Sequence, residues 1–105
     1  MELKVYAKGR VRKYDAKGIY DGKGVTVLKG SKISEKVGAK VNPVVEKLRN
    51  NPEKVSKDMI VLCDISFRSP STAANFVSGN ISNGFRVWKT EDGKELSEMR
   101  KEKNA

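Results

Sequence analysis

The chain has 105 residues, of which 37% are hydrophobic and 33% are charged, with a formal net charge of +9 and an isoelectric point near 9.8. This length suits one compact domain and is short for two. The single cysteine, Cys63, excludes an intramolecular disulfide framework, and no apolar run approaches the ~20 residues that a membrane-spanning helix needs. The first residues lack the apolar core of a signal peptide, so a cytoplasmic location is expected.

The first third of the chain alternates in the manner of β-strands. In ELKVYAK, Leu3, Val5 and Ala7 fall on one side of a strand, and the lysines and the tyrosine fall on the other. Asp and Gly at positions 15–18 and 21–24 favour turns, and the segment GVTVLKG is β-branched and apolar. These patterns predict a meander of two or three antiparallel strands over residues 2–29.

A short helix and an apolar strand are predicted in the middle of the chain. Asn42 and Pro43 suit the N-cap and the first position of a helix over about 43–50. The run MIVLCDISF, residues 59–67, is almost continuously apolar, which predicts an interior strand. Cys63 is expected to act in that strand as a small buried hydrophobe.

The remainder is predicted to form a second helix and a hairpin. Ser69 and Pro70 suit a helix start, and Gly79 suits the left-handed position that ends it. FRVWKT and KELSEM alternate and are joined by EDGK, which predicts a C-terminal β-hairpin. The expected fold is one α+β domain over residues 1–100, an antiparallel sheet of about five or six strands with two or three short helices. Residues 101–105 are expected to form a frayed charged tail.

The residue types restrict the chemistry. The chain has no histidine, which excludes Ser-His and Cys-His nucleophile pairs and His-ligated metal sites, and one cysteine cannot form a Cys-rich zinc site. Asp64 is the acid expected to be most buried, accepting hydrogen bonds from backbone N–H groups. Gly18-Ile19-Tyr20 spells half of the GIY-YIG nuclease signature, but no Tyr-Ile-Gly follows, so no nuclease activity is assigned. We expect no enzyme activity, no metal and no cofactor.

The charge distribution favours nucleic acid as the partner. Residues 1–50 hold 13 basic and 5 acidic residues, whereas residues 51–105 hold 9 and 8. A basic excess on one half is typical of nucleic-acid binders, although a solvated lysine-rich surface is the alternative. Because Lys outnumbers Arg, attraction to phosphate is favoured over readout of base edges.

Candidate contacts fall in the lysine-rich loop after the strand GVTVLKG, at the start of the second helix and close to Trp88. Helix starts present free backbone N–H groups that suit phosphate. The predicted nucleic-acid contacts are Lys29, Lys32, Ser69, Ser71, Thr72, Asn75, Asn83 and Lys89. Two structural alternatives remain: Ser69 serves as a helix cap, and Trp88 packs in the core instead of stacking on a base.

Several segments carry a family resemblance. VLKGS (27–31), FRSPSTAA (67–74), GNISNGFRVWK (79–89) and GKEL (93–96) resemble a small domain of unknown function found near the C-terminus of GIY-YIG nuclease-containing proteins and in restriction-modification proteins. A looser resemblance is to the RAMA domain, which is proposed to bind DNA. Phe85 departs from that pattern, because a Trp is common at its position.

The resemblance implies a non-enzymatic DNA-binding accessory domain of a restriction, repair or mobile-element system. In this hypothesis the lysines and the start of the second helix contact phosphate, and Asn75 and Asn83 contact bases. The alternative is a protein-interaction module that docks on a nuclease or methyltransferase. That module would expose an apolar patch around Phe76, Phe85 or Trp88. The sequence does not indicate an oligomeric state.

Overall fold

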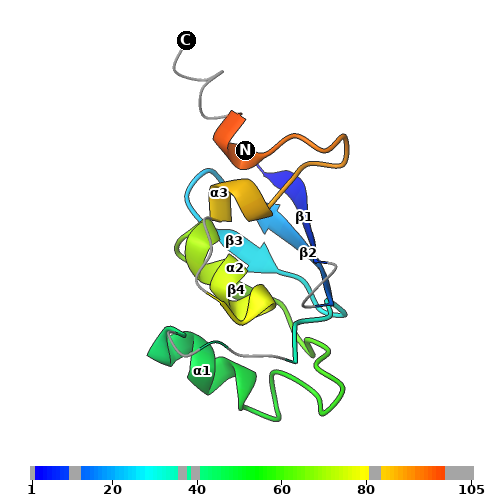
Figure 1. The fold of residues 1–105 in the computed structure, drawn as a ribbon, viewed down its shortest axis with the longest axis vertical. Coiled ribbons are helices and arrows are strands. Elements are labelled where there is room, and N and C mark those ends of the chain that lie inside the picture. Colours follow the sequence, from blue (N-terminus) through cyan, green and yellow to red (C-terminus); the bar gives the residue numbers. More distant parts are fainter. Residues whose placement is uncertain (1, 10–12, 36–37, 39–40, 81–83, 99–105) are drawn as a thin grey trace.

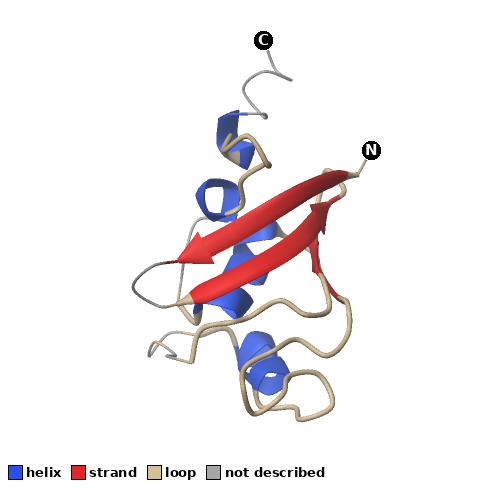
Figure 2. Cartoon of the chain, turned by 90° about the vertical axis from the view of Figure 1, so that its right-hand side faces the viewer, coloured by secondary structure: helices blue, strands red, loops and turns tan. Residues whose placement is uncertain are grey.

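The computed structural model describes residues 2–9, 13–35, 38, 41–80 and 84–98. A four-stranded antiparallel sheet in the order β1-β2-β3-β4 forms one layer, and α2 packs against it with α1 and α3 beside α2 (Figures 1 and 2). The elements are β1 (Leu3–Gly9), β2 (Tyr14–Tyr20), β3 (Val25–Val27), α1 (Pro43–Arg49), β4 (Ile65–Phe67), α2 (Pro70–Ser78) and α3 (Gly84–Val87). The α+β class and the N-terminal meander are confirmed. The predicted tail, 101–105, lies outside the described residues.

The meander forms because its side chains alternate between the two faces of the sheet. Val5 and Ala7 of β1 are fully buried, and they lie opposite Gly18 and Ala16 of β2. The turn between β2 and β3 is fixed by Asp21, whose Oδ1 accepts hydrogen bonds from the backbone N–H groups of the residues two and three positions later, at 2.9 and 2.8 Å.

The apolar run at 59–67 was predicted to be an interior strand, and this is wrong. Only β4 is a strand, and it lies at the edge of the sheet. Met59 has a left-handed backbone, with φ of 64°, and Ile60 and Val61 form only isolated bridges. The chain therefore turns within the run. Cys63 is half-buried and lies outside β4.

The two predicted helices are confirmed at their capped ends. The Asn42 side chain accepts a hydrogen bond from Val44 N at 2.9 Å, and Ser69 Oγ accepts one from Thr72 N at 3.1 Å. Gly79 ends α2 in the left-handed conformation, with φ of 71°. In α1, the buried Arg49 guanidinium donates hydrogen bonds to backbone carbonyls outside the helix.

Of the predicted C-terminal hairpin, only the part beside the EDGK turn pairs, and within the described residues the sheet has four strands rather than five or six. Thr90 N donates to Lys94 O at 2.8 Å and Leu96 N donates to Trp88 O at 3.2 Å, on either side of an isolated bridge between Lys89 and Glu95. The predicted strand FRVWKT begins instead as the helical turn α3. The cause is a close approach between segments: a Cβ on Gly84 would lie 2.0 Å from the carbonyl carbon of Pro70. The helical turn then carries Trp88 inward, where its indole Nε1–H donates to Pro70 O at 3.1 Å.

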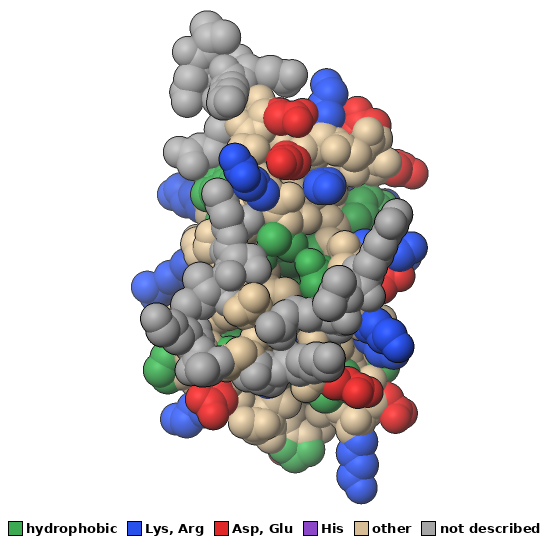
Figure 3. Space-filling model, in the orientation of Figure 1, with side chains coloured by type: hydrophobic (Ala, Val, Ile, Leu, Met, Phe, Trp, Pro, Cys, Tyr) green, Lys and Arg blue, Asp and Glu red, His purple; other side chains and the backbone are tan. Residues whose placement is uncertain are grey.

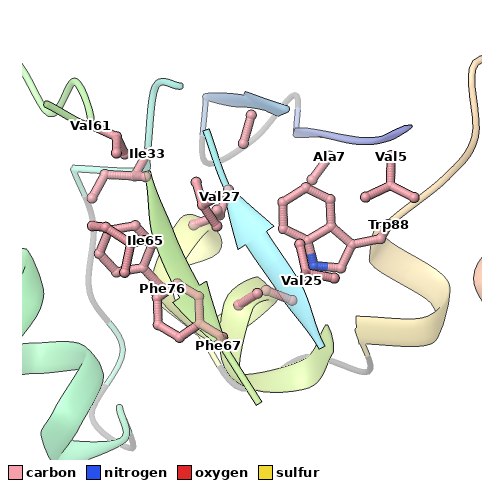
Figure 4. Packing of buried hydrophobic residues seen from close by; sticks show 14 of the residues in the cluster. Val5, Ala7, Val25, Val27, Ile33, Val61, Ile65, Phe67, Phe76 and Trp88 are labelled. Carbon is pink, nitrogen blue, oxygen red and sulfur yellow. The ribbon is translucent and has the colours of Figure 1, made fainter. Parts of the chain in front are cut away.

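Trp88 packs in the core, which confirms the alternative that it is a core residue. Its side chain is fully buried and lies beside Val5, Ala7 and Val25 (Figure 4). Gly18 makes room for it, because a Cβ there would meet Trp88 Cζ3 at 3.3 Å. The inner face of the sheet is thus covered by α2 and this indole, and α3 packs against α2.

Candidate nucleic-acid interface

The outer face of the sheet is left uncovered by the helices. α2 packs against the inner face, and Figure 2 shows β1 and β2 in front with the helices behind them. The side chains of β1 and β2 that point outward include Lys4, Lys8 and Lys17, all of them exposed. Every second residue of these strands therefore faces solvent, which gives the sheet one buried and one solvated side.

Tyr6 lies at the centre of this outer face. Directly opposite residues in antiparallel pairs point to the same face, and Tyr6 is opposite Lys17 on β2. On its other side Tyr6 is paired with Lys89, through backbone N–H···O bonds of 2.7 and 2.9 Å. Lys4 and Lys8 are two residues away along β1, which is the same-face spacing of a strand. Four lysines thus surround one tyrosine.

Lys32 extends the same face beyond β2. Its backbone forms a β-bridge with that of Asp15, which lies opposite Lys8 in the pairing of β1 with β2. Lys32 is exposed, whereas its neighbours Ser31 and Ile33 are buried, so its side chain points outward. Asp15 lies between the two lysines on this row and offsets part of their charge.

We call this surface the open face. It comprises Lys4, Tyr6, Lys8, Lys17, Lys32 and Lys89, together with Asp15. Within the part of the chain that the structure describes, none of the five lysines is held in an ion pair, so their ammonium groups remain available to an anion. Lysines spaced along and across a strand pair form an array of point charges that suits a phosphate backbone.

An acidic border limits the open face on one side. Glu91 and Asp92 line a shallow depression together with Lys4, and the backbone of Glu95 forms an isolated β-bridge with that of Lys89. A hydrogen bond from the Thr90 hydroxyl lowers the pKa of Asp92, so this carboxylate is ionised near neutral pH. A polyanion is therefore attracted to the lysines and repelled from the turn beyond them.

The structure brings together two of the predicted contacts and places a third elsewhere. Lys32 and Lys89 belong to the open face. Lys29 is exposed after the end of β3, where its backbone N–H donates to Asp64 Oδ1 at 2.8 Å. Asp64 thus accepts a backbone hydrogen bond as expected, but the expectation that it is buried is wrong, because it is exposed.

The predicted contacts at the start of α2 lie in the helical layer, away from the open face. Ser69 Oγ accepts from Thr72 N and pairs with Thr72 Oγ1 at 2.9 Å. Ser71 Oγ accepts from Gly84 N at 3.1 Å, which attaches α3 to α2. These side chains are half-buried. Their hydrogen bonds are used to cap the helix and to join two helices.

Asn75 was predicted to contact a base, but its amide is committed within the protein. The side chain is 6% exposed, its Oδ1 accepts from Asn42 N at 3.0 Å, and its Nδ2 donates to Asn80 O at 2.7 Å. We therefore exclude Asn75 from the proposed interface. Asn83, the other predicted base contact, lies outside the described residues.

The apolar patch expected of a docking module is not found at Phe76 or Trp88, because both side chains are fully buried. Phe85 is half-buried against the core. The exposed large hydrophobic residues of the described chain are Val44, at 63%, and Leu62, at 39%. On the face drawn in Figure 3, the described apolar side chains reach the surface in separate areas among charged groups.

Sequence reasoning missed Tyr6, Lys4, Lys8 and Lys17 as functional candidates. The signal was present, because the alternation of ELKVYAK already placed the lysines and the tyrosine on the side opposite the core. What was missing was the pairing that brings Lys17 and Lys89 to either side of Tyr6.

The described residues contain no group of three or more His, Cys, Asp or Glu side chains placed to hold a metal ion. Over the same residues, no helix has the length and apolar character to cross a membrane.

Comparison with known proteins identifies a family without assigning an activity. The model of the family described as "Domain of unknown function (DUF4357)" matches residues 5–100, nearly the whole chain, so the protein belongs to this family. No curated protein and no solved structure shows significant similarity to the chain.

Proposed function

We propose that this member of the DUF4357 family is a non-enzymatic accessory domain that binds nucleic acid, with DNA favoured, through the open face. The observation that carries the proposal is the arrangement of Lys4, Lys8, Lys17 and Lys89 around Tyr6 on a solvated sheet surface. The net charge of +9 supplies a long-range attraction to any polyanion.

The binding energy would come mainly from phosphate neutralisation. Each lysine that meets a phosphate releases condensed counterions, so the affinity falls steeply as the salt concentration rises. Lysine ammonium groups are point charges without the bidentate geometry by which arginine reads guanine, so we expect weak discrimination between base sequences.

The choice of DNA rests on the resemblance of FRSPSTAA and GNISNGFRVWK to domains of restriction-modification proteins. In such a setting the domain would hold DNA for a nuclease or methyltransferase carried by another polypeptide or domain. We favour nucleic acid over a docking partner as the ligand of this surface, because the described chain exposes charge here and little apolar area.

The test is the binding of a labelled DNA hairpin with a single-stranded tail, measured at two salt concentrations. The double variant K17E/K89E reverses the two lysines that flank Tyr6. The matched control, K47E/K57E, reverses two exposed lysines outside the open face. Each Lys-to-Glu substitution lowers the net charge by two units, so the two variants carry the same net charge and differ only in where the substitutions lie.

We expect the affinity of the wild-type protein to fall steeply with salt and K17E/K89E to lose most of it. The control should lose much less, through long-range attraction alone. Absent or salt-insensitive binding, or equal losses in the two variants, would contradict the proposed function.

A further inference from the structure

Tyr6 differs from the other aromatic residues of the described chain in its relation to the core. Trp88, Phe67 and Phe76 are buried, and the half-buried aromatic residues Tyr14, Tyr20 and Phe85 pack against the core. Tyr6 is half-buried as well, but it lies on the open face and does not belong to the core cluster. Within the described residues, the Tyr6 side chain makes no hydrogen bond and no ring contact, although the backbone of Tyr6 is held on both sides. The Tyr6 ring is therefore held on a paired strand, and no packing or hydrogen bond within the described protein explains why an aromatic residue is present at this position.

The residues around Tyr6 are typical of a surface that binds a nucleotide base and not of a hydrophobic core. Its neighbours along and across the strands are the lysines of the open face. Beside them, Ile19 lies opposite Lys4 and is half-buried, and Thr26 follows it on β3. A ring within a lysine array can stack on a base while the ammonium groups hold the phosphates on either side of the nucleotide.

The shape of the open face argues for a single strand. The major groove of duplex DNA admits a helix or a two-stranded ribbon. Here the helices lie behind the sheet (Figure 2). β1 and β2 are not a free ribbon, because β3 and Lys32 pair with β2 and Lys89 pairs with β1. The bases of a duplex are stacked on each other and cannot reach Tyr6, whereas those of a single strand can be splayed over a sheet and stacked on its aromatic residues.

We propose that Tyr6 is a stacking platform for an unpaired base, so that the open face prefers single-stranded DNA over duplex. This inference rests on the proposed function and specifies its ligand. Lys17 and Lys89 would hold the phosphates that flank the stacked base, and Lys4 and Lys8 would extend the contact along β1.

The test compares an oligodeoxythymidine of about ten nucleotides, a size within the range of small single-strand-binding domains, with a duplex of equal length. Three variants of the full chain are measured beside the wild type. Y6L removes the ring but keeps an apolar side chain on the strand, Y6F keeps the ring without the hydroxyl, and K17E/K89E removes the flanking charges. Thermal unfolding of each variant establishes that it is folded.

We expect the single strand to bind more tightly than the duplex. Y6L should weaken single-strand binding about 5- to 150-fold, the range that base stacking on an aromatic side chain spans, and should change duplex binding little. Y6F should retain most of the affinity. A strand containing 2-aminopurine should lose fluorescence on binding to the wild type and to Y6F, and much less on binding to Y6L.

Two results would overturn the inference while leaving the proposed function intact. One is salt-dependent binding that falls in K17E/K89E but not in Y6L, and the other is tighter binding to duplex than to the single strand. If no variant and no wild-type sample binds either DNA, the proposed function fails together with the inference.

Discussion

The two faces of β1 are built from neighbouring residues and have opposite properties. Val5 and Ala7 are fully buried and contribute to the core around Trp88, whereas Lys4, Tyr6 and Lys8 point to the other side. Because side chains alternate along a strand, seven residues supply both a packing surface and a charged surface. The comparison predicts that substitutions on the inner face change stability, and those on the open face change binding.

The largest loss of stability is expected from W88A. It empties a fully buried site and removes the hydrogen bond to Pro70 O, so the free energy of unfolding should fall by about 3–5 kcal/mol. Urea unfolding followed by far-UV circular dichroism measures this. W88F retains a ring and should lose less, and equal losses in the two variants would contradict the packing role.

A smaller loss is expected from G18A. A Cβ at Gly18 would lie 2.8 Å from Val25 Cγ1 and 3.3 Å from Trp88 Cζ3, so the core must shift to admit it. Overpacking of this kind costs about 1–3 kcal/mol in the free energy of unfolding. The same urea titration measures it, and an unchanged or raised midpoint would show that the indole does not pack on this glycine.

The start of α2 is expected to behave as part of the scaffold. S69A removes the side chain that accepts from Thr72 N, and the loss of such a cap typically lowers the free energy of unfolding by about 1 kcal/mol. DNA affinity of the folded variant should stay within twofold of the wild type. A folded S69A protein that no longer binds DNA would contradict this prediction and would indicate that the start of α2 contacts phosphate.

Charge reversal on the open face is expected to leave stability nearly unchanged. The Lys17 and Lys89 side chains are exposed and are held in no ion pair within the described chain, so K17E/K89E should change the free energy of unfolding by less than about 0.5 kcal/mol per site. Paired measurements of unfolding and of DNA binding check this. A large loss of stability would mean that the lysines also support the fold.

The smallest effect is expected from Asp21 in the β2–β3 turn. Hydrogen bonds from the backbone N–H groups of Gly24 and Lys23 lower the pKa of this carboxyl below its ordinary value of 3.8. A carboxyl with a lowered pKa in the folded state stabilises the protein above its unfolded pKa, and this contribution is lost as the pH falls through the folded pKa. The difference in stability between wild type and D21N should therefore shrink below about pH 4, as unfolding at several pH values can measure. A difference independent of pH would contradict the role of the charge.

Local signals made the caps and the first strands predictable. The side chains of Asn42 and Ser69 accept hydrogen bonds from backbone N–H groups within three residues, and each is followed by a proline. Their roles as helix caps can therefore be inferred from spacing alone. The alternation in β1 has the same local character. These signals need no knowledge of the rest of the fold.

Contacts between distant segments account for what the sequence does not predict. α3 replaces a predicted strand because Gly84 approaches Pro70, and Asn75 is withdrawn from the surface by a hydrogen bond to Asn42, 33 residues earlier. The open face depends on the bridge between Tyr6 and Lys89, which no local pattern predicts. The sequence therefore indicates the basic character of the proposed interface, but it does not indicate which residues form the open face.

Chemical-shift mapping on the isotope-labelled protein during titration with oligodeoxythymidine tests the central claim most directly. The account predicts that the largest backbone amide shifts fall on β1 and β2, with Tyr6, Lys17 and Lys89 among them, and that residues 69–75 move little. The largest shifts at residues 69–75, or no shifts at all, would contradict it.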